Sequence, residues 1–196
     1  AERLSRAPAV KVLVIEAGPD FRAPDIPAGF RDSTMGMALG MGHANDVVHP
    51  EYYWHGITAT RARGQQAFPY RRGRGVGGSS VVNGIYAMRG IASDFEQWER
   101  MGATGWGPQA MLQGFINIED DEKFGDQPYH GTGGPTPIYR ESEAGWGGVD
   151  RALLAAATDA GYGFEPDLNS PTSTGVSPFP MNVRHGLRIS ANHAYI

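Results

Sequence analysis

The segment RRGRGVGGSSVVNG, residues 71–84, is the densest run of glycine in the 196-residue chain. It includes the spacing G-x-G-x-x-G, which is typical of a loop that binds the pyrophosphate of a dinucleotide. Such a loop follows a buried strand and opens a helix. The preceding residues 65–72, QQAFPYRR, are polar and interrupted by proline, so they do not predict a buried strand. A Rossmann pyrophosphate turn is therefore not expected at this position.

The same segment keeps features of a ligand contact. Ser79 and Ser80 resemble a helix N-cap, where main-chain amides are free to bind an electron-rich group. Glycine lacks Cβ and lets a ligand approach the backbone closely. A glycine-rich surface loop without a ligand explains the same residues, and the motif alone does not decide between the two interpretations.

Near the start of the chain, residues 10–15 (VKVLVI) form an apolar run rich in β-branched residues. The run predicts a buried parallel strand that ends at Glu16, which Ala17, Gly18 and Pro19 follow. In a nucleotide-binding βαβ unit, an acidic residue at this position binds the ribose hydroxyls, so Glu16 is a candidate ribose ligand. The first strand and its glycine turn are absent from the sequence, and we expect the chain to begin inside such a unit.

Three helices are expected beyond residue 90. A capping-box pattern at 93–96 predicts the first, Pro108 begins the second, and the third covers about residues 148–160. Residues 178–184 predict a strand, whereas residues 20–70 predict a long covering loop with one short helix. The residues expected to be buried are Phe95, Trp98 and Met101 in the first helix, Met111, Leu112, Phe115 and Ile116 in the second, Val149, Leu153 and Ala156 in the third, and Met35, Met37 and Met41 in the loop.

Composition narrows the classes of partner. The net charge is −4, and the basic residues are 15 Arg and 2 Lys, which argues against nucleic acid or an acidic membrane as the main partner. No apolar run approaches the length of a membrane span. The absence of cysteine excludes a disulfide scaffold, a zinc knuckle and an iron–sulfur cluster. We expect a cytoplasmic location.

Other candidate sites have simpler explanations. None of the six histidines has zinc-binding spacing, and we interpret them, including His130 in HGTGG, as loop or packing residues. The acidic run at residues 120–122 follows a predicted helix and is interpreted as a solvated face instead of a metal site. Ser79 lacks the G-x-S-x-G context of a hydrolase nucleophile.

The stretch from Gly73 through Asn83 to Glu96 resembles the first signature of the glucose–methanol–choline (GMC) oxidoreductases, which are FAD-dependent alcohol oxidases and dehydrogenases. The resemblance continues in order along nearly the whole chain. It includes AERLS (1–5), VLVIEAGPD (12–20), DFEQWERMG (94–102), GWGP (105–108), HGTGGPTPI (130–138) and GLRISANHAYI (186–196).

This resemblance implies an α/β fold with an incomplete, Rossmann-like FAD-binding domain and the start of an α+β substrate domain. Residues 1–34 would belong to the FAD-binding domain, and residues 35–100 would form the lid and the segment that covers FAD. Residues 101–189 would be part of the substrate-binding domain, and residues 190–196 would return to the FAD-binding domain.

The resemblance also implies how the cofactor is held. Val82 occupies the position at which some members carry a histidine bonded to the flavin, so FAD is expected to be non-covalent. The resemblance assigns no metal ligand and no catalytic residue here, because the second family signature and the C-terminal histidine with its His or Asn partner do not occur in the chain. The expected FAD-binding residues are Glu16, Gly75, Gly77, Gly78, Ser79, Asn83, Gly84 and Tyr86.

The implied activity is oxidation of a small-molecule alcohol by hydride transfer to flavin N5. Two alternatives remain open. One is a non-redox GMC-like flavoenzyme, such as a photodecarboxylase or a hydroxynitrile lyase. The other is a non-catalytic FAD-binding or assembly fragment. We expect the chain to be the N-terminal part of a longer enzyme that works with a second polypeptide or with the rest of the same enzyme, and without nucleic acid or membrane.

Overall fold

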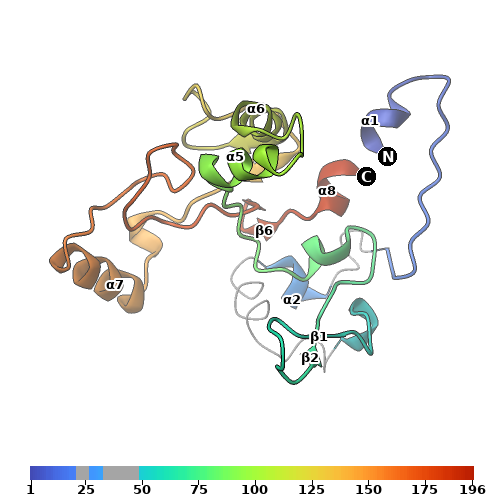
Figure 1. Ribbon diagram of the computed structural model, residues 1–196, viewed down its shortest axis with the longest axis horizontal. Helices are drawn as coiled ribbons and strands as arrows, with labels where there is room; N and C mark the ends of the chain where they lie inside the picture. Colours follow the sequence, from blue (N-terminus) through green and yellow to red (C-terminus); the bar gives the residue numbers. More distant parts are fainter. Residues whose placement is uncertain (21–26, 33–48) are drawn as a thin grey trace. The chain divides into compact units, whose positions relative to one another are not determined.

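The computed structural model describes residues 1–20, 27–32 and 49–196 (Figure 1). The chain divides into two compact units, the first comprising Ala1–Ile85 with His185–Ile196 and the second comprising Tyr86–Arg184. The methionines predicted to pack in the loop, Met35, Met37 and Met41, lie outside the described residues, as does the beginning of the predicted lid.

The first unit has a small aromatic core. The rings of Phe30 and Tyr52 lie 4.8 Å apart, and both side chains are buried together with Tyr53 and Val81. Main-chain hydrogen bonds join Trp54 N–H to Arg72 O and Arg74 N–H to Tyr52 O, so the glycine-rich segment runs antiparallel to residues 52–54 at the edge of this core. The elements are α1 (Glu2–Ser5), α2 (Ala28–Arg31), η1 (Pro50–Tyr52), β1 (Thr58–Ala59), β2 (Phe68–Pro69), η2 (Gly78–Val81), β6 (Leu187–Arg188) and α8 (Ala191–Tyr195).

The prediction of a long loop with one short helix over residues 20–70 is incomplete in its described part. This part contains α2, η1 and a two-stranded antiparallel sheet in which Thr58 pairs with Pro69 and Ala59 with Phe68. The single short helix that was expected is therefore accompanied by a second helical turn and a hairpin.

The predicted strand at residues 10–15 is also wrong. These residues are extended but form no strand, and Leu13 and Ile15 are 83% and 85% exposed. A buried parallel strand is stabilised by ladder hydrogen bonds to neighbouring strands and by burial of both faces. None of the described strands pairs with residues 10–15, so the apolar pattern has nothing to bury it.

The second unit combines three main helices with short strands. The pair β3–β4 is parallel, with Glu119 opposite Thr136 and Asp121 opposite Ile138, and β5 lies beside β4. Helices α5 and α6 contact each other (Figure 1). None of the described helices has both the length and the hydropathy needed to cross a bilayer. The elements are α5 (Ala92–Arg100), α6 (Pro108–Ile118), β3 (Glu119–Asp121), β4 (Thr136–Ile138), η3 (Glu143–Gly145), α7 (Gly148–Asp159) and β5 (Val183–Arg184).

The helix predictions succeed in position and fail in part on burial. Pro108 is the first residue of α6, as expected, and Gly161 follows the end of α7 with φ +90°. In α5 the expected capping box at 93–96 is wrong, because the helix begins at Ala92 and Asp94 accepts from Ile91 N–H at 3.3 Å. The strand expected at 178–184 is confirmed only at its last two residues.

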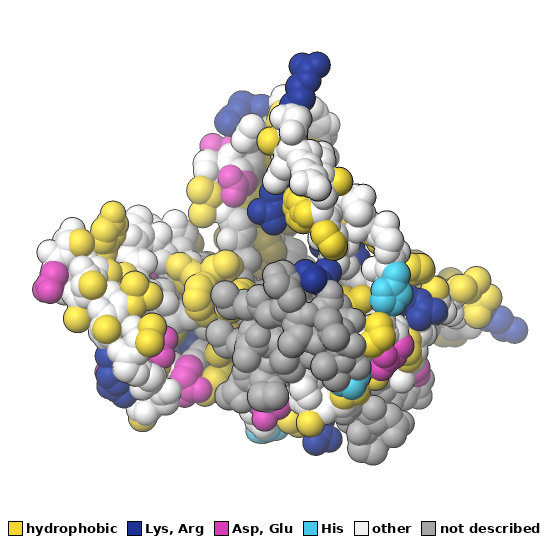
Figure 2. All heavy atoms as spheres, turned by 90° about the horizontal axis from the view of Figure 1, so that it is seen from below, with side chains coloured by type: hydrophobic (Ala, Val, Ile, Leu, Met, Phe, Trp, Pro, Cys, Tyr) yellow, Lys and Arg dark blue, Asp and Glu magenta, His cyan; other side chains and the backbone are white. Residues whose placement is uncertain are grey.

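Several predicted core residues are exposed. In α5, Phe95 is buried, but Trp98 and Met101 are 46% and 77% exposed. In α7, no residue is buried, and Val149 and Leu153 are 82% and 62% exposed. Figure 2 shows hydrophobic side chains, in yellow, over the part at the left of the view, where α7 lies. The apolar faces therefore follow the expected helical period, but they lack a covering element among the described residues.

Candidate functional site

The turn that contains Glu16 meets the glycine-rich segment backbone to backbone. A Cβ on Gly18 would lie 2.4 Å from Arg74 C and from Gly75 N, a separation that only glycine permits. Val76 N–H donates to Pro19 O at 3.0 Å, and the guanidinium of Arg74 donates to Ala17 O. The structure therefore brings the predicted ribose ligand and the predicted glycine loop to one place in the first unit.

Glu16 itself is exposed beside this contact. Its Oε1 accepts the Gly18 N–H at 2.9 Å, which closes the turn and fixes the direction of the carboxylate. One carboxylate oxygen accepts one donor here, so lone pairs remain for further donors such as two ribose hydroxyls.

The glycine-rich segment folds back on itself. Gly73 N–H donates to Ser79 Oγ at 3.0 Å, and a Cβ on Gly73 would lie 2.5 Å from Gly78 O. Gly77 and Gly78 have φ of +102° and +56°, and the side of Gly78 that a Cβ would occupy is open. Side chains other than glycine rarely adopt these angles. At Ser79 and Ser80, which resemble a helix N-cap in the sequence, the backbone forms the single 3₁₀ turn of η2.

The end of the segment is a turn at Asn83. The Asn83 Oδ1 accepts the Ile85 N–H at 3.0 Å, and Ile85 has φ +59° although it is β-branched and buried. Arg188 donates to Asn83 Oδ1 at 2.7 Å and to Asn83 O at 2.6 Å. Within the described residues, the main-chain N–H groups of Asn83 and Gly84 have no acceptor.

Helix α8 packs on the same segment. The Ala191 N–H donates to Ser80 Oγ at 2.9 Å, and a Cβ on Gly77 would lie 3.1 Å from Asn192 N. Burial lowers the pKa of His193, whose Nδ1 lies 3.0 Å from Ser190 Oγ. The segment GLRISANHAYI is thus joined to the glycine-rich segment, about one hundred residues earlier in the chain.

All eight predicted cofactor residues lie within the described part of the chain. Seven of them, Glu16, Gly75, Gly77, Gly78, Ser79, Asn83 and Gly84, belong to the first unit. Tyr86 is the first residue of the second unit, where it bridges to Met181 and its ring lies 4.7 Å from that of Phe179. Open glycine backbone, free amides and an exposed carboxylate are groups that can contact a phosphate-linked ribose cofactor, so the chemistry of the seven residues in the first unit is compatible with FAD.

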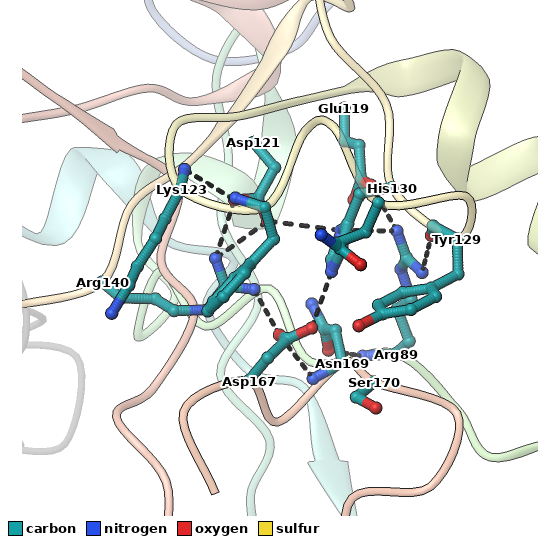
Figure 3. A network of polar contacts seen from close by, with 12 residues as sticks. Arg89, Glu119, Asp121, Lys123, Tyr129, His130, Arg140, Asp167, Asn169 and Ser170 are labelled. Carbon is teal, nitrogen blue, oxygen red and sulfur yellow. Dashed lines mark hydrogen bonds and ion pairs between the residues drawn. The ribbon is translucent and has the colours of Figure 1, made fainter.

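The second unit contains a buried ionic network (Figure 3). His130 lies between two carboxylates, with Nδ1 2.8 Å from Glu119 Oε1 and Nε2 2.8 Å from Asp167 Oδ2. Arg140 donates to both oxygens of Asp121, at 2.9 and 2.8 Å, and to Asp167 at 2.6 Å. Arg89 pairs with Glu119. Three cations thus meet three carboxylates.

The electrostatics of the network favour the charged forms of His130, Glu119 and Asp167. Burial alone lowers the pKa of His130, but its hydrogen bonds to Asp167 and Glu119 and the charge of Asp121 raise it to about 9. Burial raises the pKa values of Glu119 and Asp167, but hydrogen bonds from His130 and the nearby arginines outweigh it and hold them below their ordinary values. At neutral pH the His130 imidazole is therefore protonated and donates from both nitrogens.

The sequence interpretation of the acidic run at 120–122 is wrong for Asp121, which is buried with a salt bridge to Arg140, whereas Glu122 is exposed. A signal was available, since Glu119 and Asp121 are two apart and share one face of a strand, while Asp120 faces the other way and pairs with Arg184. No pattern indicated that His130 and Asp167 would join them.

A cavity of about 170 Å³ lies in the second unit beside this network. Met88, Phe115, Ile118 and Ile138 supply apolar walls, and Arg89 and Glu119 reach its edge. Sites for drug-sized ligands enclose roughly 300–1,000 Å³. The cavity is therefore too small for a dinucleotide and is not the candidate cofactor site.

Comparison with protein families gives one matching model. The model, described as "GMC oxidoreductase", matches residues 30–196 of this chain. These residues include the glycine-rich segment, the buried ionic network and α8.

Individual proteins similar to this chain agree with the match to the family model. The chain is 32% identical over 201 residues to a 5-(hydroxymethyl)furfural oxidase of Methylovorus sp., with all of this chain and 37% of the relative covered. It is 30% identical over 197 residues to an oxygen-dependent choline dehydrogenase of Vibrio vulnificus, again over the whole chain and 33% of the relative. The chain thus spans about a third of the length of the curated relatives it matches.

Solved structures show the same relationship. The crystal structure of a pyridoxine 4-oxidase from Mesorbium loti superposes with a TM-score of 0.82 at 31% identity, over 99% of this chain and 36% of the other. A formate oxidase superposes with a TM-score of 0.76 at 24% identity, over all of this chain and 34% of the other, and shows the fold alone.

Proposed function

The chain belongs to the GMC oxidoreductase family, and we propose that it forms part of an FAD-dependent enzyme that oxidises a small-molecule alcohol. The fold is that of the N-terminal part of these enzymes. The observation that carries the proposal is the backbone contact between the Glu16–Pro19 turn and Arg74–Val76. This contact puts an exposed carboxylate, which can accept from ribose hydroxyls, beside a glycine-rich loop whose backbone a cofactor can approach closely.

The proposed roles follow from the groups that each residue offers. Glu16 would accept hydrogen bonds from the ribose hydroxyls. Gly75, Gly77 and Gly78 would let the cofactor approach the backbone, and the free amides of Asn83 and Gly84 would donate to its electron-rich atoms. Ser79 and Tyr86 complete the proposed cofactor set.

Bound FAD would supply the acceptor for a hydride from the alcohol carbon, and this chain would supply the binding groups. Oxidation of the alcohol also requires a group that takes the hydroxyl proton. His130 is protonated, enclosed and bonded at both nitrogens, so it is unsuited to that role. We place the proton acceptor outside residues 1–196.

FAD is proposed to bind without a covalent bond through residue 82. Val82 has only an aliphatic side chain, which cannot attack a flavin carbon. Residues 1–34, 35–100, 101–189 and 190–196 remain assigned, as a proposal, to the FAD-binding domain, the lid, the substrate-binding domain and the return to the FAD-binding domain.

The test uses the complete enzyme that contains this chain. The purified protein should carry FAD, with flavin absorbance close to one equivalent per polypeptide. Under anaerobic conditions a panel of primary alcohols, including choline and hydroxymethyl-substituted aromatic rings, should bleach that absorbance. A flavin-free protein, or bound flavin that no alcohol in the panel reduces, would contradict the proposal.

A further inference from the structure

Arg188 is a buried cation that donates hydrogen bonds to the turn at Asn83. It is 3% exposed and donates to Ser80 O at 3.1 Å, to Asn83 Oδ1 at 2.7 Å and to Asn83 O at 2.6 Å. None of these partners is a carboxylate. Burial lowers the pKa of Arg188 to about 10, so the guanidinium remains charged at neutral pH without an ion pair in these contacts.

These contacts determine which way the Asn83 amide faces. Its Oδ1 receives hydrogen bonds from the Arg188 guanidinium and from the Ile85 N–H. Both partners are donors that cannot accept, so the oxygen of the amide must face them and the NH₂ group must point away. Asn83 is exposed, and its Nδ2 has no partner among the described residues.

The backbone of the turn holds this arrangement under strain. Ile85 has φ +59° and is 1% exposed, and a β-branched residue rarely adopts this region of φ. Such a strained conformation persists only where surrounding contacts enforce it. Strained conformations of this kind cluster at ligand sites. Here the Ile85 N–H donates to Asn83 Oδ1, which Arg188 also contacts, and the Ile85 side chain is buried.

We propose that Arg188 is a positioning residue that fixes the Asn83 side chain with its NH₂ group outward, as a hydrogen-bond donor to an acceptor atom of the bound flavin ring. The inference rests on the proposed function, because it takes the ligand to be FAD. It adds a role for a residue outside the glycine-rich segment. Arg188 acts through its planar fork, which reaches the side-chain and main-chain oxygens of Asn83 at once, and not through its charge alone.

The experiment compares lysine replacements at two buried arginines in the complete flavoenzyme. Arg188→Lys keeps a positive charge but loses the fork, and we expect flavin reduction by alcohol to slow at least tenfold, with a shifted flavin absorption spectrum and midpoint potential. Arg140→Lys is the matched control, because Arg140 is also buried and its partners Asp121 and Asp167 belong to the second unit. It should leave the spectrum and potential unchanged.

Two further variants separate positioning from a purely structural role. Asn83→Asp keeps an oxygen toward Arg188 and replaces the outward donor by an acceptor, so it should fold, bind FAD and lower both the midpoint potential and the rate of reduction. In an Asn83→Ala background, Arg188→Lys should have no further effect on the spectrum. If Arg188→Lys fails to fold, the Asn83→Asp result decides.

The outcomes are distinct. A wild-type enzyme without flavin would contradict the proposed function itself. Wild-type enzyme with bound FAD, combined with a normal spectrum, potential and reduction rate in Arg188→Lys, or in Asn83→Asp, would overturn the role of Arg188 and leave the proposed function standing. Additive effects of Arg188→Lys and Asn83→Ala would also overturn it.

Discussion

His130 Nε2 lies 2.8 Å from Asp167 Oδ2, and both side chains are buried in the second unit. On the other side of the same ring, Nδ1 lies 2.8 Å from Glu119 Oε1 and 3.3 Å from Asp121 Oδ2. The imidazolium of His130, the first residue of the turn HGTGG, therefore joins β3 to the loop that carries Asp167. Its charge state should control the stability of this unit.

Stability should decline on the alkaline side. The folded pKa of His130 is raised from 6.5 to about 9, so its stabilisation is complete below pH 6.5 and is lost as the pH rises through about 9. The loss is on the order of 3 kcal/mol. Urea unfolding of the complete enzyme, followed by circular dichroism between pH 6 and 10, measures it. An unchanged midpoint across this range would contradict the protonated state.

Acid should also destabilise the network. The pKa values of Glu119 and Asp167 are lowered in the folded state, so their stabilisation is present above about pH 4.5 and is lost as the pH falls through the folded values. The same titration between pH 2 and 5 should show a falling midpoint. Glu119→Gln and Asp167→Asn should each flatten that fall, and a fall of undiminished size in both variants would refute the assignment.

Replacing His130 should be costly at neutral pH. His130→Gln leaves buried carboxylates with fewer donors, and breaking a buried pair in this way costs about 3–5 kcal/mol. His55→Gln is a control at an exposed histidine in the other unit and should change the melting temperature little. A melting temperature equal to wild type in His130→Gln would show that the network is not needed for the fold.

Glu16→Ala should weaken FAD binding at least tenfold. Two charge-assisted hydrogen bonds to ribose hydroxyls are each worth roughly 1.5–3 kcal/mol, and alanine loses both. Retention of flavin during dialysis measures the effect. Glu96→Ala removes an exposed carboxylate on α5 and should retain flavin as well as wild type does. Equal retention in Glu16→Ala would remove Glu16 from the cofactor site.

Gly18→Ala should separate the Glu16 turn from the glycine-rich segment. Its Cβ would meet main-chain atoms of Arg74 and Gly75 at 2.4 Å, and backbone must move to relieve this clash. We expect loss of bound flavin and of thermal stability. Gly114→Ala, in α6, meets no atom within 4 Å and should stabilise by about 0.5–1 kcal/mol. A Gly18→Ala enzyme with a full complement of bound flavin would show that the contact between the Glu16–Pro19 turn and Arg74–Val76 is not needed for FAD binding.

The sequence was sufficient for the family and the fold, but not for all local structure. The segment 73–96 identified a GMC oxidoreductase, and the match over residues 30–196 confirms this. Local signals such as Pro108 at the start of α6 also succeeded, because they depend on neighbouring residues only. The strand at residues 10–15 failed, because a strand exists only with hydrogen-bonded neighbours, and the described residues supply none.

For the candidate site, too, residues in a local sequence pattern could be predicted, whereas residues joined only by long-range contacts could not. Glu16 and the glycines could be selected by residue type and spacing, and the structure brings them together, although their role in FAD binding stays a prediction. Arg188 could not be found, because its partners are 105 and 108 residues away in sequence. The ionic network was missed for the same reason, since His130 and Asp167 are separated by 37 residues.

The balance of three cations against three carboxylates has a consequence for evolution. Replacing any one of these six residues by a neutral one leaves a buried charge without its counterpart. A lineage that changes one residue at a time therefore passes through a protein of low stability. Descendants that lose His130 should therefore have lost Glu119, Asp121 or Asp167 as well, whereas Arg184 and Asp120, which are partly exposed, are free to drift one at a time. The residues of the network would then be conserved together or lost together.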